Sequence, residues 1–241
     1  SQLPGKVFRL RRQLPDRKEL FLMEPIRVFY RKTDTAKYIS HLDINRCFQR
    51  AMKRAGIPLW FTEGFNPHAY LTFPLPLALG YESLCECVDF RLTQPMEPGE
   101  IVDRLNRVLP MGLKAYAAAP PVYKAADIAL AAYTVWLTLA DTDSEQSVRI
   151  LEAFFAQPEI TAMKRTKKGE REISLKEHLH GLSLQADGDM VLLSVQLPAG
   201  NELNINPTLV LDAFGVQTGM LIDRLAVQKT AVLTKDGKNF A

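Results

Sequence analysis

The side chains best placed for chemistry lie between Tyr38 and Glu82, and one of them is a histidine at a predicted helix start. His41 follows Ser40, which is placed to cap a helix. The helix dipole disfavours the cationic form of a histidine there, so the neutral base is available. His41 is therefore a candidate general base that could activate a ribose 2′-hydroxyl. The alternative is a first-turn histidine that bonds the backbone or Asp43.

A loop further along this stretch carries three polar side chains, those of Glu63, Asn66 and His68. Pro67 fixes its own φ and restricts Asn66 to extended conformations. A restricted loop can hold polar groups in one arrangement for a ligand. The alternative is a β-hairpin in which Asn66 makes an Asx-turn. We expect the three side chains to bind a ligand, on one concave surface shared with the start of the His41 helix.

Two clusters of basic residues could contact a phosphate backbone. The first has arginines four residues apart on one helix face, for which a solvated surface is the alternative. The second brackets Gly169 in a basic finger, and a loop with five cations is better suited to follow phosphates. The predicted nucleic-acid contacts are Arg46, Arg50 and Arg54 on the helix and Lys164, Arg165, Lys167, Lys168 and Arg171 in the finger.

Metal and cofactor sites have little support in the sequence. The pairs Cys85–Cys87 and His178–His180 are close ligand pairs, but structural zinc sites usually use wider cysteine spacing. GxGxxG, Walker, HExxH and nucleophile-elbow motifs are all missing from the sequence. We therefore predict no metal and no cofactor. The incomplete catalytic set favours a protein that is not an enzyme by itself.

Composition bounds the class of protein. The chain has 241 residues, 47% of them hydrophobic, which is enough for one large or two small domains. The net charge of +3 is too small to indicate a polyanionic partner, so local clustering must decide. Three cysteines do not make a disulfide framework, and no apolar run approaches the ~20 residues of a membrane span. We expect a cytoplasmic protein with no membrane association.

The elements that would position these side chains follow from hydrophobic periodicity. The predicted strands are 26–31, 57–62, 87–92 and 113–119 in the first half, and 133–139, 190–197 and 225–233 in the second. The predicted helices are 40–55, one from Pro98 to about Val108, one capped by Ser144, and one from Pro207 to Gly215. Segments 160–165 and 181–185 flank a long polar insertion.

Both halves follow the order β-α-β-β-α-β, the split unit of the ferredoxin-like fold. We therefore predict an α+β protein with two tandem ferredoxin-like (βαββαβ) domains. These are residues 26–121 and 132–241, joined by a connector at 122–131. Residues 1–25 form a basic N-terminal extension, which is either an added expression segment or an upstream extension.

Three motifs carry a resemblance to a known family. They are SHLD at 40–43, RAGIPLWFTEGFNPH at 54–68 and PLPLALGYES at 74–83. In these motifs the chain closely resembles the radical-SAM-linked proteins, a bacterial family of unassigned function encoded beside or fused to radical SAM enzymes. The resemblance continues to about Thr230, through KRTKKGE and INPTLVLDAF. It departs at Cys85-Glu86-Cys87, where we expect a Gly-Glu-aromatic run. The resemblance implies a radical SAM enzyme as partner and implies no activity.

Two functions from different classes remain open. The first is a non-catalytic module that presents RNA, such as tRNA or rRNA, or a protein substrate to a radical SAM enzyme. The second is a metal-independent ribonuclease that uses His41. Tandem ferredoxin-like folds are also the architecture of CRISPR repeat-processing ribonucleases, whose glycine-rich C-terminal loop is missing here. A purely structural interaction partner is a third possibility and predicts no RNA affinity.

Overall fold

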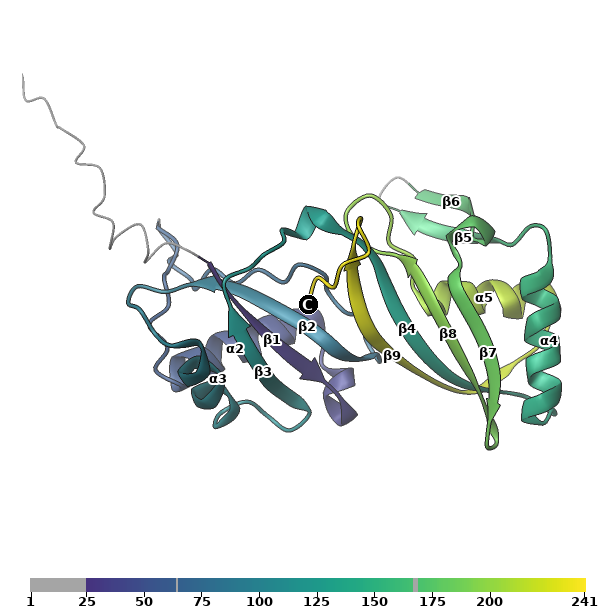
Figure 1. Cartoon of the computed structure of the whole chain (residues 1–241), viewed down its shortest axis with the longest axis horizontal. Helices are drawn as coiled ribbons and strands as arrows, with labels where there is room; N and C mark the ends of the chain where they lie inside the picture. The colour runs from purple at the N-terminus through teal and green to yellow at the C-terminus, as the bar shows by residue number, and fades with distance from the viewer. Residues whose placement is uncertain (1–24, 64, 167–168) are drawn as a thin grey trace, which may run out of the picture.

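The computed structural model of the chain describes residues 25–63, 65–166 and 169–241. Within these ranges the protein is a mixed α+β structure dominated by one large sheet (Figure 1). The first half contains β1 (Pro25–Lys32), the 3₁₀ turn η1 (Asp34–Tyr38), α2 (His41–Arg54), β2 (Glu82–Arg91), α3 (Pro98–Asn106) and β3 (Leu113–Ala119). None of the helices in the described ranges is both long enough and apolar enough to cross a bilayer.

The second half repeats the alternation of strands and helices and adds a hairpin. It contains η2 (Ala125–Asp127), β4 (Ile128–Leu139), α4 (Ser144–Ala156), β5 (Thr161–Thr166), β6 (Gly169–Ser174), η3 (Lys176–His178), β7 (His180–Asp187), β8 (Met190–Pro198), α5 (Pro207–Thr218) and β9 (Ile222–Thr234). The polar insertion expected after 160–165 contains β6 and η3, and β6 pairs with β5 as a hairpin that stands outside the large sheet.

Seven strands form the large sheet in the order β3-β1-β2-β9-β4-β8-β7. Within each half the neighbouring strands are antiparallel. The halves meet where β2 and β9 run parallel, through only two residue pairs, Glu82 with Gln228 and Ser83 with Lys229. Figure 1 shows α2, α3 and α5 behind the strands. Because the strands form one continuous sheet, two separate ferredoxin-like domains stay a prediction.

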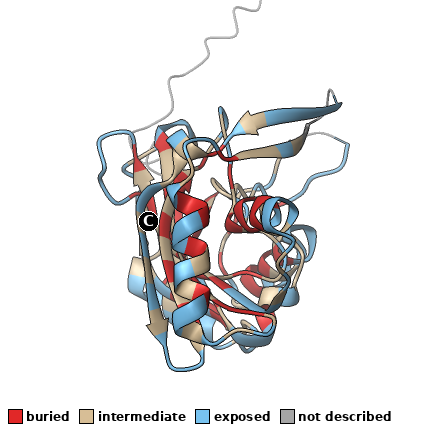
Figure 2. Cartoon of the chain, turned by 90° about the vertical axis from the view of Figure 1, so that its right-hand side faces the viewer, coloured by how far each residue is buried: buried red, intermediate tan, exposed pale blue. Residues whose placement is uncertain are grey.

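The hydrophobic core has two clusters, one for each half. Figure 2 shows the buried residues in red on the strands and helices. In the first, Phe48 of α2 packs with residues of β1, β2 and α3. In the second, Phe154 of α4 and Phe214 of α5 meet edge to face with ring centroids 5.2 Å apart. Cys85 and Cys87 of β2 belong to the second cluster although they come from the first half. Strand β2 therefore contributes side chains to the cores of both halves.

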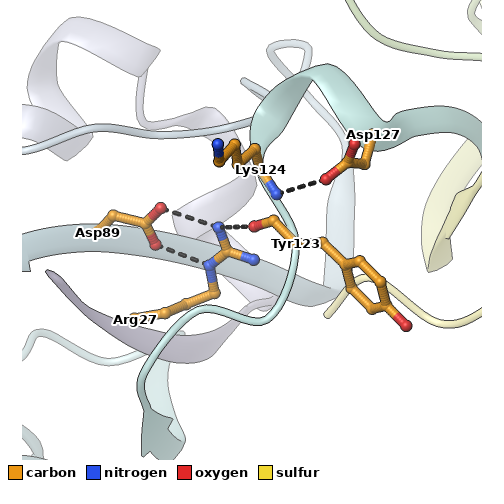
Figure 3. Close-up of polar contacts among 5 residues, drawn as sticks. All are labelled: Arg27, Asp89, Tyr123, Lys124 and Asp127. Carbon is orange, nitrogen blue, oxygen red and sulfur yellow. Dashed lines mark hydrogen bonds and ion pairs between the residues drawn. The ribbon is translucent and has the colours of Figure 1, made fainter.

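A buried arginine fastens the connector to the sheet (Figure 3). Arg27 on β1 is 1% exposed and lies opposite Asp89 on β2. Its Nε and Nη2 atoms donate to the two carboxylate oxygens of Asp89 at 2.7 and 2.9 Å, and Nη2 also donates to the carbonyl oxygen of Tyr123 at 3.0 Å. The guanidinium carbon lies 4.4 Å from the ring centre of Phe240. One side chain thus joins β1, β2, the connector and the C-terminal segment.

The expected strand at 57–62 is reduced to isolated bridges, Leu59 with Leu92 and Phe61 with Ala69. The chain folds back on itself after Phe61, because the backbone N–H of Thr62 donates to the carbonyl oxygen of His68 at 2.9 Å. Pro58 lacks an N–H, so this residue can pair only through its carbonyl oxygen, which accepts from the backbone N–H of Thr93 at 2.8 Å. The sequence therefore overestimates regular pairing at this edge.

Other predicted boundaries also differ from the structure. The cap of α4 is Asp143, whose carboxylate accepts from the backbone N–H of Gln146 at 2.7 Å, whereas the Ser144 hydroxyl donates to the carbonyl of Gly188. Helix α5 continues past Gly215 and ends before Gly219, whose φ of 71° is left-handed. Strand β2 begins at Glu82, earlier than the predicted start at residue 87. Strand β4 begins at 128, inside the predicted connector.

Candidate nucleic-acid interface

Helix α2 separates an apolar face from a cationic one. The Ser40 hydroxyl caps the helix by accepting from the backbone N–H of Asp43 at 3.2 Å, which confirms the predicted start. Ile44, Phe48, Ala51 and Met52 are buried, and the three predicted arginines are exposed. This is the pattern of a helix whose apolar stripe packs on the core and whose charges face solvent.

Four arginines gather in one groove beside α2. The groove has a volume of about 520 Å³, and its walls are α2 and the chain that follows α3. Its charged lining is Arg46, Arg50, Arg54, Arg107 and Asp43. Its remaining lining includes Cys47, Ala51, Val108 and Leu109. This groove, called the arginine groove below, combines four cationic side chains with apolar ones.

The one carboxylate of the arginine groove is already engaged. Asp43 accepts from the Ser40 hydroxyl at 2.7 Å and from Nη1 of Arg46 at 3.1 Å. These two hydrogen bonds, the Ser40 bond first, lower the pKa of Asp43 below its ordinary value. Arg46 is therefore partly neutralised, whereas Arg50, Arg54 and Arg107 make no ion pair with any residue in the described ranges. These three cations are available to an anionic ligand.

The predicted ligand-binding loop borders a second groove of about 510 Å³. His68 lines it together with Arg50 and Lys53 of α2, so Arg50 belongs to both grooves. The ring nitrogen Nδ1 of His68 lies 3.1 Å from the Thr62 hydroxyl and 3.1 Å from the carbonyl oxygen of Asn66. The histidine ring is thereby held in place by its own loop.

The other predicted groups of the loop and helix start do not join this second groove. Glu63 and Asn66 are exposed and outside its lining. His41 is exposed and packs edge-on against Phe73, with ring centres 5.3 Å apart. The second groove is bounded by the C-terminal half of α2 rather than by its start, so the loop and His41 do not share it. His41 makes no hydrogen bond with any residue that the structure describes.

The predicted basic finger is the hairpin β5–β6. Lys164 and Arg171 are cross-strand partners, and the Lys164 ammonium donates to the carbonyl oxygen of Asn204 at 2.7 Å. Arg171 is exposed. Lys167 and Lys168 lie outside the described residues, as does the side chain of Arg165. The hairpin and α2 lie at opposite ends of the molecule (Figure 1), so the two basic clusters do not form one surface.

Sequence reasoning missed Arg107, which completes the arginine groove. It lies one residue beyond α3 and is far from the α2 arginines in the chain. An arginine between a helix and Pro110 is not a sequence pattern that indicates nucleic-acid binding. Only the packing of α3 beside α2 brings it to the groove.

The close cysteine pair is buried rather than arranged as a metal site. Cys85 and Cys87 lie on β2 with 5% and 7% exposure. Burial raises the pKa of the Cys85 thiol to about 11 and that of the Cys87 thiol to about 12, which disfavours the thiolate that metals bind. In the described part of the chain, no three His, Cys, Asp or Glu side chains are grouped so that they could hold a metal ion.

Comparisons with known proteins identify a family and a fold. No curated protein matches the chain. A chain from the crystal structure of a Cbf5-Nop10-Gar1 complex matches with a TM-score of 0.51 and 11% identity, covering 90% of this chain and 51% of that one. A protein of unknown function from Galdieria sulphuraria matches with a TM-score of 0.26 and 11% identity, covering 86% and 98% of the two chains.

The first of these likenesses concerns the fold alone, and this chain spans about half the length of that neighbour. The sequence comparison is more specific, because residues 25–207 match a single family along most of the described chain. The protein therefore belongs to the family described as uncharacterized protein conserved in bacteria (DUF2344).

Proposed function

We propose that this protein is a non-catalytic RNA-binding module that works with a radical SAM enzyme. The observation that carries the RNA part is the arginine groove, in which four arginines from two segments accompany one carboxylate. Arginine is suited to this role because its planar guanidinium donates two hydrogen bonds to a phosphate.

The spacing of the cations supports a single strand as ligand. Arg46, Arg50 and Arg54 recur every four residues, which is about 6 Å along a helix axis. A row of this kind can contact successive phosphates of one strand, while the apolar side chains in the lining offer surface for a ribose or a base. Single-stranded nucleic acids bind where a cationic groove follows the backbone and apolar or aromatic surface receives the bases.

The strand order supports reading the fold as two ferredoxin-like units joined edge to edge. In the second half the sheet order is β9-β4-β8-β7, so the strands that come fourth, first, third and second in the chain lie side by side. Helices follow the first and third of these strands in the chain, β4 and β8. In the first half the sheet order is β3-β1-β2, which places the fourth, first and third strands of such a unit side by side. The segment near Leu59, bridged to Leu92 at the end of β2, would be its irregular second strand. Paired units of this kind present two helical surfaces, of which α2 is one.

The partner part of the proposal is supported by the motifs at 40–43, 54–68 and 74–83. Two of these motifs, at 40–43 and 54–68, border the arginine groove or the second groove. An accessory protein would place its RNA-binding surface beside its contact with the enzyme. Affinity purification of the tagged protein from its native host tests this part. We expect a radical SAM enzyme to co-purify, and its repeated absence would contradict the partner proposal while leaving RNA binding open.

Fluorescence anisotropy with a labelled single-stranded RNA tests the RNA part. The double variant Arg50→Ala and Arg54→Ala should weaken binding and reduce the slope of log K against log salt by about 0.7 for each lost phosphate contact. The matched control is Arg149→Ala with Lys235→Ala, which removes the same charge from exposed positions in the second half. Equal binding and equal slopes for the two double variants would show that net charge, not the groove, governs affinity.

A further inference from the structure

A small cavity lies at the junction of the two halves of the sheet, apart from the arginine groove. Its volume is about 160 Å³. One wall is the segment Leu75–Ala78 of the first half, and the other comes from β4, β9 and the chain before α5. Its polar lining is Tyr81, Tyr133, Asn204, Asn206 and Lys229. Both halves of the chain are needed to build it.

A buried lysine with spare hydrogen-bond donors lines this cavity. Lys229 is 1% exposed, and its ammonium nitrogen lies 2.7 Å from Oε1 of Glu86. Among the described residues, this is the only ion pair or hydrogen bond of the ammonium group. An ammonium group has three N–H donors. Two donors of a fully buried cation are therefore left for a ligand.

A tyrosine hydroxyl on the same face also lacks a partner. Tyr133 on β4 is the cross-strand partner of Lys229 on β9, so both side chains project to one side of the sheet. Tyr133 is 6% exposed, and its hydroxyl makes no hydrogen bond with any residue that the structure describes. The neighbouring Tyr81 differs, because its hydroxyl is bonded to the hydroxyl and backbone N–H of Thr208. The Tyr133 hydroxyl therefore lies on the wall of the cavity as a donor without a partner among the described residues.

A second buried lysine lies near the Lys229–Glu86 ion pair. Lys32 on β1 is 3% exposed and, like Lys229, is a cross-strand partner of Ser83. Burial lowers the pKa of Lys32, and the charges of Glu86 and Lys229 act on it in opposite directions. The Lys32 ammonium also donates to the carbonyl oxygen of Ile39 at 2.9 Å. Two lysines near the Glu86 carboxylate attract an anion more than one balanced ion pair would.

We propose that this cavity binds a small oxyanion, a carboxylate or phosphate group, through Lys229 and Tyr133. The ligand's remaining atoms are few and apolar, because the cavity is smaller than the ~300–1,000 Å³ of sites for drug-sized ligands and its opposite wall is Leu75, Leu77 and Ala78. Asn204 is exposed and belongs to the lining, so the cavity opens to solvent on that side. This site is independent of RNA binding at the arginine groove.

Nuclear magnetic resonance of the full chain labelled at the tyrosine ζ-carbon tests the site directly. The probes are propionate, its neutral analogue propionamide, and inorganic phosphate. We expect the Tyr133 resonance, assigned by its absence in Tyr133→Phe, to shift saturably with propionate and not with propionamide. A saturable shift with phosphate but not propionate also supports an oxyanion site and identifies phosphate as the better source.

The variant Tyr133→Phe is the sharpest test because its hydroxyl contacts no described residue. It should keep the wild-type melting temperature and weaken propionate binding about fivefold to tenfold, the effect of one lost hydrogen bond. The matched control Tyr70→Phe, at a half-exposed position in the loop, should bind as wild type does. No saturable shift with either anion at 100-fold molar excess and above, or equal affinity in Tyr133→Phe, would overturn the proposal. RNA affinity should be the same in Tyr133→Phe, which separates this outcome from that of the arginine groove.

Discussion

Lys229 on β9 holds its ammonium nitrogen 2.7 Å from Oε1 of Glu86 on β2, and both side chains are at least 94% buried. The pair spans the short parallel ladder that joins the two halves of the sheet. A buried ion pair is weak evidence for added stability, since desolvation offsets the attraction. The position of the ion pair is more informative. It lies where β2 and β9 pair through only two residue pairs, and Lys229 also lines the cavity at this junction.

Removing one partner of this pair should be strongly destabilising. Lys229→Met leaves the Glu86 carboxylate buried without its cation, and we expect the free energy of unfolding to fall by about 3–5 kcal/mol. The double variant Lys229→Met with Glu86→Gln should recover most of that loss, since both members of the ion pair are then neutral. Urea denaturation measures both. Lys235→Met, at an exposed lysine, is the control. A single variant as stable as wild type would mean that water reaches the pair.

The loop at 62–68 should contribute to RNA binding through His68 more than through Asn66. His68 lines the second groove beside Arg50, whereas the Asn66 side chain is exposed and only its backbone carbonyl meets the histidine ring. We therefore expect His68→Ala to weaken RNA binding severalfold and Asn66→Ala to change it little. Both should leave the melting temperature nearly unchanged, because exposed positions contribute little to stability. A large loss of stability in either variant would show that the loop has a structural role instead.

The three thiols should differ in reactivity. Cys85 and Cys87 have pKa values raised by burial to about 11 and about 12. At pH 8 a thiol with a pKa of about 11 is thiolate in only about one molecule in a thousand, and the thiolate is the reactive form. Cys47 is half-buried in the arginine groove, with its pKa also raised by burial. Iodoacetamide followed by mass spectrometry should label Cys47 first and label the other two only in urea. Early labelling of Cys85 or Cys87 would show that β2 opens locally.

Purified protein should bind RNA without cleaving it. His41 packs against Phe73, lies outside both grooves and makes no hydrogen bond with any described residue. Incubation with total RNA in EDTA should therefore leave the RNA intact, as judged by gel electrophoresis. Cleavage that His41→Ala abolishes, with binding retained, would instead establish the metal-independent ribonuclease.

Local features were readable from the sequence wherever neighbours in the chain decide them. Helix α2 is one example, because its cap at Ser40, its apolar stripe and its arginine row all depend on spacing within 15 residues. Helix starts at Pro98 and Pro207 are others, since proline suits the first helical turn. The predicted start of a helix was wrong where two neighbouring residues could both act as the cap, as Asp143 and Ser144 could for α4.

Long-range contacts could not be read in the same way. Arg107 reaches the arginine groove only because α3 packs beside α2, and no periodicity links it to Arg50. Tyr133 and Lys229 are 96 residues apart in the chain and become cross-strand partners only when β9 inserts between β2 and β4. The place of β9 in the sheet depends on its pairing with β2 and β4, which are distant in the chain.

By itself, the sequence determined the type and approximate place of most helices and strands, the cationic face of α2 and the polar character of the loop at 62–68. These follow from side-chain period, capping and turn chemistry, which act over a few residues. The tertiary structure alone decided that the strands form one sheet, that Arg107 joins the arginine groove, and that the loop meets the C-terminal half of α2. It also decided that Lys32, Glu86 and Lys229 share a buried site, because burial and pairing of distant charges depend on which surfaces pack together.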